Sequence, residues 1–137
     1  MNQSHKIKIL IWFAALVSLL VYLLLAWYAA SQIIPKEITA QLTTLQNITF
    51  SISAFFLLAG FAVPAASKLW PKLRGSPIVL LIIQLALFEI CGLSGMLFTV
   101  ISGHTDSTLH ATLAAFVGML SAFPRDILAR GKGAVNT

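Results

Sequence analysis

The stretch that decides the fold covers residues 78–101 and reads IVLLIIQLALFEICGLSGMLFTVI. Its only acidic or basic side chain is that of Glu89, near the middle. An apolar run of about 20 residues is long enough to cross the ~30 Å hydrocarbon core of a bilayer as a helix. A charged side chain at that depth costs at least about 2.5–3.5 kcal/mol, so an acidic residue there is usually kept for a task. The stretch therefore predicts a membrane-spanning helix with a functional carboxyl group.

The composition of the whole chain agrees with this prediction. Of its 137 residues, 58% are hydrophobic and 9% are charged, and the mean hydropathy is +0.92. Soluble domains carry about 25% charged residues. A soluble core of this size could not hide so many apolar side chains, so we expect an all-α integral membrane protein whose main partner is the lipid bilayer. The length allows one domain over residues 1–137.

Four apolar segments divide the chain, and we expect each to form a transmembrane helix. They cover about residues 7–34, 48–69, 76–102 and 108–128, and a polar loop is expected over residues 35–46. The first segment is far longer than the apolar region of a signal peptide, so we expect it to remain uncleaved. The fourth is short and rich in Ala and Gly, which favours close packing against neighbouring helices.

The positive residues predict the orientation. One side of the predicted membrane receives eight of the nine: Lys6, Lys8, Lys68, Lys72, Arg74, Arg125, Arg130 and Lys132. The positive-inside rule makes that side cytoplasmic and places both termini there, and we expect a bacterial inner membrane. The positive residues flank apolar runs rather than forming a stripe, so the net charge of +5 does not predict nucleic-acid binding.

Aromatic residues fit the same orientation. Trp12 and Trp70 fall where the cytoplasmic interface is expected, and Trp27 and Tyr28 fall at the opposite interface. Tryptophan and tyrosine are enriched at both interfaces of a membrane, because their rings are apolar and their polar atoms reach water. We therefore expect all four side chains to act as interface anchors.

A stripe of small and polar residues runs along one face of the third segment. At 100° per residue, Gln84, Cys91, Gly95 and Ser102 share one narrow face, with Thr99 at its edge. Small residues let helix backbones approach, and polar groups bond across the interface, so the stripe predicts a helix-packing face. Cys91 is the only cysteine, so the chain can form no internal disulfide.

Glu89 lies well over 100° from the centre of that stripe and therefore faces a different neighbour or a second subunit. No predicted span contains a Lys or Arg near its centre, so the carboxyl lacks a counter-ion and we expect it to be protonated near neutral pH. It could carry a proton or cation, or it could be a neutral acid that hydrogen-bonds a neighbouring helix. Gly92, beside it, is where a second chain could approach.

Other kinds of chemistry have weaker support. His104, Asp106 and His110 lie close in sequence at the outer edge, and two imidazoles with a carboxylate are plausible zinc or copper ligands. No fourth ligand is near them, so we assign no metal site. No span has a histidine at its centre to ligate haem. The sequence holds no catalytic triad, phosphate loop or HExxH motif, so we expect neither an enzyme nor a cofactor.

One part of the chain resembles a known family. Residues 89–96 read EICGLSGM, with a glutamate followed by an aliphatic residue and then Gly-Leu-x-Gly. Residues 58–63 read LAGFAV, and the basic loop over residues 72–77 reads KLRGSP. Together, residues 58–96 are similar to the helical hairpin of the proteolipid, or c-type, subunits of rotary ATPases. The resemblance implies that Glu89 is the ion-carrying carboxylate of a ring subunit.

Two classes of function stay open at this point. The first is proton or cation translocation or coupling through Glu89, in a homo-oligomer or with other membrane subunits that supply the missing polar groups. The second is a non-transporting membrane subunit, such as an assembly factor, an immunity-type inhibitor or an accessory anchor. In that class Glu89 is only a structural hydrogen-bonding group.

Overall fold

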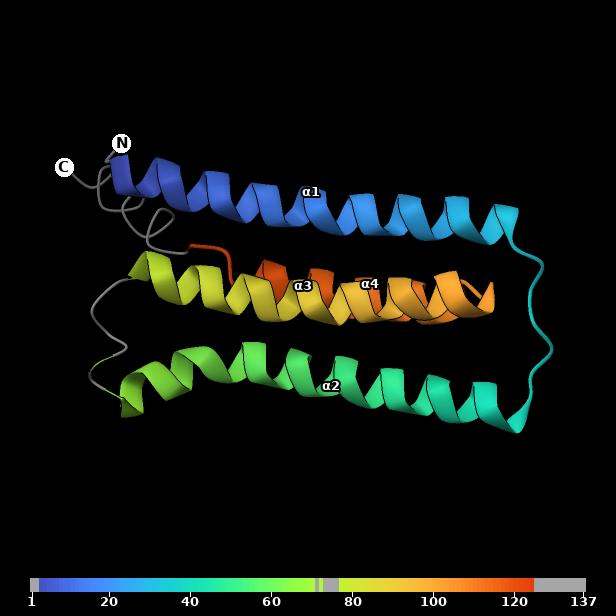
Figure 1. Ribbon diagram of the computed structural model, residues 1–137. Helices are drawn as coiled ribbons and strands as arrows, with labels where there is room; N and C mark the ends of the chain where they lie inside the picture. Colours follow the sequence, from blue (N-terminus) through green and yellow to red (C-terminus); the bar gives the residue numbers. More distant parts are fainter. Residues whose placement is uncertain (1–2, 71, 73–76, 125–137) are drawn as a thin grey trace.

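The described part of the protein is a bundle of four antiparallel helices. The computed structural model describes residues 3–70, 72 and 77–124. The helices are α1 (Gln3–Gln32), α2 (Ala40–Leu69), α3 (Pro77–Ser102) and α4 (Asp106–Ser121), and the described part of the chain contains no strand. Successive helices run in opposite directions (Figure 1). The first three helices are long and apolar enough to cross a membrane, which suggests membrane association.

The fourth helix is shorter than the others. It has 16 residues, or about 24 Å at 1.5 Å per residue, and it is not among the helices long enough to span a membrane. The sequence predicted a fourth segment over residues 108–128, but the helix ends at Ser121. Residues 125–128 of that segment lie outside the described residues.

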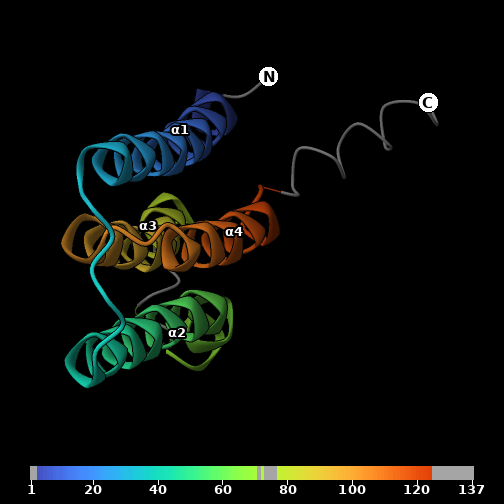
Figure 2. The ribbon, with the colours of Figure 1, turned by 90° about the vertical axis from the view of Figure 1, so that its right-hand side faces the viewer.

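The helix that carries Glu89 is central to the bundle. α3 and α4 lie side by side, with α1 on one side of this pair and α2 on the other (Figure 2), and α3 packs against all three other helices. Among its buried residues are Leu81, Leu85, Phe88 and Phe98. By contrast, the only buried residues of the 30-residue α2 are Ser53 and Gly60, so most of its apolar side chains face outward.

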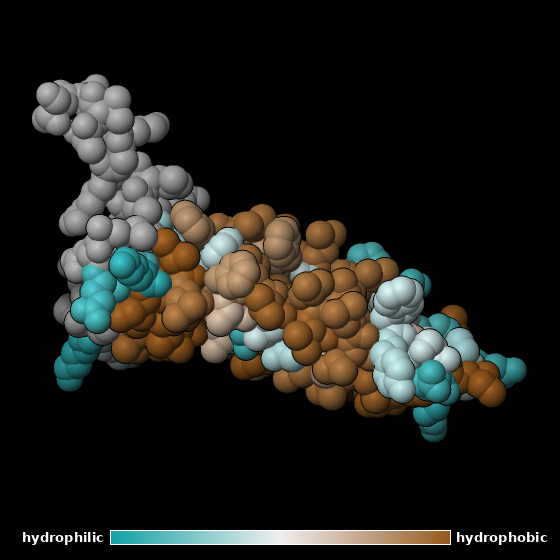
Figure 3. All heavy atoms as spheres, turned by 90° about the horizontal axis from the view of Figure 1, so that it is seen from above, coloured by the Kyte–Doolittle hydropathy of each residue, from teal (hydrophilic) through white to brown (hydrophobic). Residues whose placement is uncertain are grey.

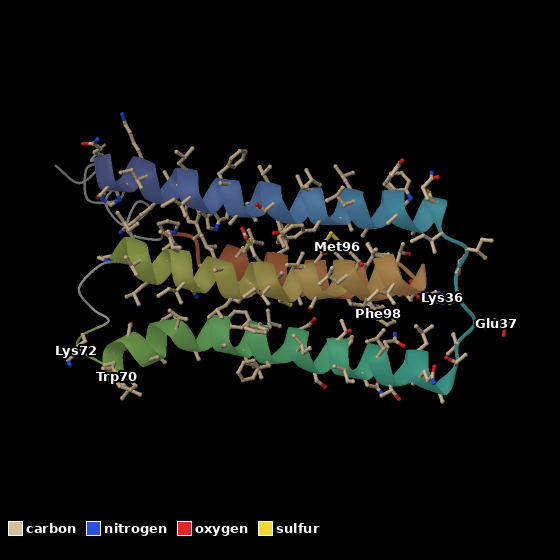
Figure 4. All side chains as sticks on the ribbon, viewed as in Figure 1. Lys36, Glu37, Trp70, Lys72, Met96 and Phe98 are labelled. Carbon is tan, nitrogen blue, oxygen red and sulfur yellow. The ribbon has the colours of Figure 1, made fainter. Side chains whose placement is uncertain are left out.

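The surface matches a molecule surrounded by hydrocarbon. Seen from the α1 side, apolar side chains cover the length of the bundle, and hydrophilic side chains gather at its two ends (Figure 3). Lys72 and Trp70 lie at one end, and Lys36 and Glu37 lie at the other (Figure 4). The start of α1 and the end of α4 lie at the Lys72 end (Figure 1), which we call the basic end. Arg74, Arg125, Arg130 and Lys132 lie outside the described residues.

The connection between α1 and α2 is shorter than the sequence predicted. The polar loop was expected over residues 35–46, but α2 already begins at Ala40. Thr39 caps the helix, because its hydroxyl oxygen accepts a hydrogen bond from the Leu42 N–H at 3.2 Å. Such a cap satisfies one of the N–H groups that the first turn of a helix leaves without a partner. The expectation of a loop was therefore wrong for residues 40–46.

The connection between α1 and α2 is hydrogen-bonded to the turn between α3 and α4. The Lys36 N–H donates to the Ser102 carbonyl at 3.0 Å, and the Lys36 carbonyl accepts a bond from His104 Nε2 at 2.9 Å. Gly103 lies between these residues with φ of +77°, a conformation that glycine adopts without steric cost. A Cβ at Gly103 would lie 3.0 Å from Pro35 Cα, so the close approach of the two connections also requires glycine.

The Phe88 ring joins α2, α3 and α4 at the centre of the bundle. It is fully buried and passes between two glycines, Gly60 on α2 and Gly118 on α4. A Cβ at either glycine would lie 2.5 Å from Phe88 Cε1, which is far closer than a van der Waals contact. The Phe61 ring packs edge-on against the same ring, with 5.3 Å between centroids. The ring is therefore held between two helix backbones.

One expected interface anchor has an internal role instead. The Trp12 indole N–H donates to the Met119 carbonyl at 2.7 Å, and its ring packs edge-on against Phe123. Trp12 therefore ties α1 to the end of α4. The other three anchors, Trp27, Tyr28 and Trp70, are exposed, as an interfacial position requires.

Candidate functional site

The Glu89 carboxyl lies on α3 and is only half-buried. Tyr22 of α1 is the titratable group within electrostatic range of it. Among the residues that the structure describes, none forms a hydrogen bond or an ion pair with this carboxyl. Buried polar groups in folded proteins nearly always have a partner. The Glu89 carboxyl therefore differs from the partnered hydroxyls of Thr99 and Ser53.

Side chains of the same chain fill the space beside Gly92. It is buried, and a Cβ there would lie 2.7 Å from Leu19 Cδ2 and 3.9 Å from Tyr22 Cδ2, both on α1. The sequence suggested Gly92 as the place where a second chain could approach. That expectation is corrected here, because Leu19 fills the space and Gly92 serves the contact between α3 and α1.

The stripe of small and polar residues lies on the other side of α3. The structure buries all five of its members: Gln84, Cys91, Gly95, Thr99 and Ser102. Gly95 allows the closest approach to α4, because a Cβ there would lie 2.6 Å from Ala111 Cβ and 3.0 Å from the Ser107 carbonyl oxygen. The stripe and the Glu89 carboxyl therefore face different neighbours of α3.

Thr99 and Thr108 connect α3 to α4 near the end of the bundle opposite the basic end. The Thr99 hydroxyl donates to the His104 carbonyl at 2.8 Å, the Thr108 hydroxyl donates to the Gly95 carbonyl at 2.8 Å, and the two hydroxyls are in contact with each other. Both side chains are fully buried or nearly so. Each hydroxyl has a partner, so this network fixes helix positions and offers no open site.

A second polar contact joins α3 to α2. The Ser53 hydroxyl lies 2.5 Å from that of Ser94 and 3.4 Å from the Cys91 carbonyl, and the Cys91 thiol donates to the Ala111 carbonyl at 3.7 Å. Sequence reasoning missed Ser53 and Ser94. The usable signal was the pair of serines, Ser51 and Ser53, within the apolar run of α2.

Gln84 differs from the rest of the stripe. Its side chain is 9% exposed, yet no described residue forms a hydrogen bond with its amide. It lines a cavity of about 230 Å³ at the basic end of the bundle, together with Lys8, Ser67, Pro77 and other residues. Gln84 is therefore not a hydrogen-bonded packing residue like Thr99.

The three weak metal candidates do not form a ligand set. His104 contacts the Lys36 carbonyl through Nε2, and His110 Nδ1 lies 2.7 Å from the Asp106 carbonyl. Across residues 3–70, 72 and 77–124, no three His, Cys, Asp or Glu side chains gather into a group that could hold a metal ion.

Comparison with models of known families, with curated proteins and with solved structures gives no match to this chain. The similarity of residues 58–96 to the rotary-ATPase proteolipids therefore stays a prediction. The interpretation of Glu89 rests on the geometry of this chain alone.

Proposed function

We propose that this chain is an integral membrane protein with both ends in the cytoplasm, and that it couples proton or cation movement to Glu89. The observation that supports the proposal most is the Glu89 carboxyl itself, half-buried on the central helix without a hydrogen-bond or ion-pair partner among the described residues. Acidic residues within membrane spans mark ion pathways and proton relays.

A purely structural role for Glu89 has less support. A structural acid in a membrane helix would form hydrogen bonds to neighbouring helices, as Thr99 and Ser53 do in this bundle. Every unsatisfied polar group in hydrocarbon is costly. If Glu89 binds and releases a proton there, this task explains why the protein tolerates the free-energy cost of a carboxyl without an internal partner.

An oligomer would complete the pathway. One carboxyl with Tyr22 nearby is too little to conduct an ion across a ~30 Å hydrocarbon core. Symmetric copies, or other membrane subunits, would supply further polar groups next to Glu89. The similarity to proteolipid subunits points in the same direction, because those subunits act as rings.

The orientation also follows from charge. Lys72 lies at the basic end and Lys36 at the opposite end (Figure 4), and the remaining lysines of the described chain belong to segments at the basic end. The positive-inside rule places the basic end in the cytoplasm. An inner membrane of a bacterium is the proposed location.

Proton flux in proteoliposomes tests this function. Purified protein would be reconstituted with a pH-sensitive dye inside the vesicles, and a potassium diffusion potential would drive protons inward. Wild-type protein should give flux above that of protein-free vesicles, and Glu89→Gln should abolish the excess. Glu37→Gln is the matched control, because Glu37 is an exposed loop carboxyl and its loss should leave the flux intact. Wild-type flux equal to that of empty vesicles would contradict the transport function.

The competing function is a non-transporting membrane subunit. It has one specific observation in its favour: α2 leaves most of its apolar side chains uncovered, including Phe50, Phe55 and Leu58. A partner helix could pack on that surface. In this case Glu89→Gln would assemble with its partner and function like the wild type.

A further inference from the structure

We propose that the cavity at the basic end of the bundle binds a phosphate-bearing anion, the headgroup of an anionic phospholipid. The cavity has a volume of about 230 Å³ and is bordered by residues of α1, α2 and α3 and by Pro124 after α4. It lies away from Glu89, which is not among its lining residues. The site is therefore separate from the proposed coupling carboxyl.

The Gln84 amide is the first observation that points to a ligand. Its side chain is 9% exposed, it lines the cavity, and it forms no hydrogen bond with any described residue. The amide has two N–H donors, and they meet the cavity instead of a protein acceptor. An oxygen-rich ligand in the cavity would accept these bonds.

The electrostatics of the cavity select an anion. Lys8 of α1 contributes a positive charge to the lining. Pro77, the first residue of α3, also lines it, so the positive end of the α3 dipole lies at the edge of the site. The first turn of α3 contains no acidic residue to cancel this field. Helix N-termini favour phosphate and other anions for this reason.

A bend in α2 opens the space. Pro64 lies inside the helix and lines the cavity with Ser67. A proline within a helix removes one backbone hydrogen bond and kinks the helix, and Figure 1 shows α2 bending towards its end at the basic end of the bundle. The Ser67 hydroxyl, bonded to the Pro64 carbonyl at 2.7 Å, adds a further polar group to the wall.

A lipid fits the position better than a soluble anion. Trp70 and Lys72 lie at the same end of the bundle (Figure 4), where the membrane interface is expected. Gln84 lies seven residues beyond Pro77, or about 10 Å along the helix axis. The cavity therefore extends from the interface towards the hydrocarbon, and the apolar walls formed by Leu80 and Leu81 suit the glycerol and upper acyl carbons of a lipid.

Retention of lipid by the purified protein tests the proposal. Wild type, Gln84→Leu and Lys8→Gln would be purified in detergent, mixed with equal amounts of phosphatidylglycerol and phosphatidylcholine, and measured by native mass spectrometry. Gln46→Leu and Lys36→Gln are the matched controls, since both residues lie towards the opposite end of the bundle. A thermal unfolding curve for each variant would verify that it is folded.

The site predicts that wild type retains phosphatidylglycerol in preference to phosphatidylcholine. Loss of one hydrogen bond to a charged group corresponds to roughly a tenfold loss of affinity or more, so Gln84→Leu and Lys8→Gln should each weaken retention about tenfold. If millimolar inorganic phosphate displaces the lipid, the site recognises phosphate chemistry from a soluble source as well. Equal retention of the two lipids without any effect of phosphate, or unchanged retention in folded Gln84→Leu, would overturn the proposal.

Discussion

Replacing Gly118 with alanine should destabilise the bundle through a single clash. The added Cβ would lie 2.5, 2.6 and 2.8 Å from three atoms of the Phe88 ring. The ring cannot yield towards α2, because the Gly60 backbone already lies so close to it that a Cβ added there would also be 2.5 Å from the ring. Accommodating the methyl group therefore requires α2 or α4 to move.

The magnitude follows from two opposing effects. Inserting a methyl group into a well-packed core costs about 1–3 kcal/mol. Alanine is a better helix former than glycine by roughly 0.8–1.0 kcal/mol, which offsets part of that cost. We expect a net loss of up to about 2 kcal/mol in the free energy of unfolding for Gly118→Ala. The measurement is reversible unfolding of the purified protein in mixed micelles.

A double-mutant cycle tests the cause. Phe88→Leu replaces the ring that the new methyl group would strike with a smaller side chain, so Gly118→Ala should cost less in that background. Residues in direct contact show coupling energies of about 0.5–3 kcal/mol, and we expect a value in this range. If Gly118→Ala stabilises the protein by the full helix-propensity difference, or if the two changes are strictly additive, the reasoning about a ring held between two glycines is refuted.

Three other substitutions test individual hydrogen bonds and one close backbone contact. Thr99→Val should lower the free energy of unfolding by about 0.5–1.5 kcal/mol, because it removes the bond to the His104 carbonyl while Thr108 keeps its bond to the Gly95 carbonyl; micelle unfolding measures it. Thr112→Val should be neutral or stabilising in the same assay, since the buried Thr112 hydroxyl has no partner among the described residues. Gly103→Ala should cost about 1–2 kcal/mol, because φ is +77° and the methyl group would meet Pro35; equal stability would contradict this.

The sequence predicted the helical architecture because apolar runs of this length have one main solution. The lengths of residues 7–34, 48–69 and 76–102 are matched to a bilayer, and the structure contains a long helix in each region. The sequence could not give the local end of each helix. Residues 40–46 were expected in a loop, but they belong to α2, which begins after the cap at Thr39. A threonine in a polar segment is compatible with a loop and with a helix cap, so the sequence does not decide between them.

Sequence reasoning could place residues on a helix face but could not say what each face meets. The wheel separated Glu89 from the stripe that contains Cys91 and Gly95, and in the structure Glu89 lies near Tyr22 of α1 while Gly95 meets α4. The identity of the neighbour depends on packing between distant segments. This is why Leu19, which fills the space at Gly92, and Ser53, which meets Ser94, were not found from periodicity.

Gln84 shows the same limit in another way. On the wheel it is equivalent to Cys91 and Ser102, so the pattern assigned it to helix packing. In the structure its amide meets a cavity instead of a neighbouring helix, because Pro64 lies opposite and bends α2 near that level. The periodic pattern of α3 contains no information about a bend in α2.

Carbodiimide labelling of Glu89 in lipid nanodiscs tests the central claim most directly. These reagents modify a protonated carboxyl that is reachable from lipid, and mass spectrometry across pH 5 to about 9 would locate the modified residue. An exchangeable ion site at Glu89 should give labelling that persists at neutral pH, fades in alkaline buffer or is blocked by sodium, and is absent in Glu89→Gln. No labelling of Glu89 at any pH in folded protein would contradict an exchangeable ion site.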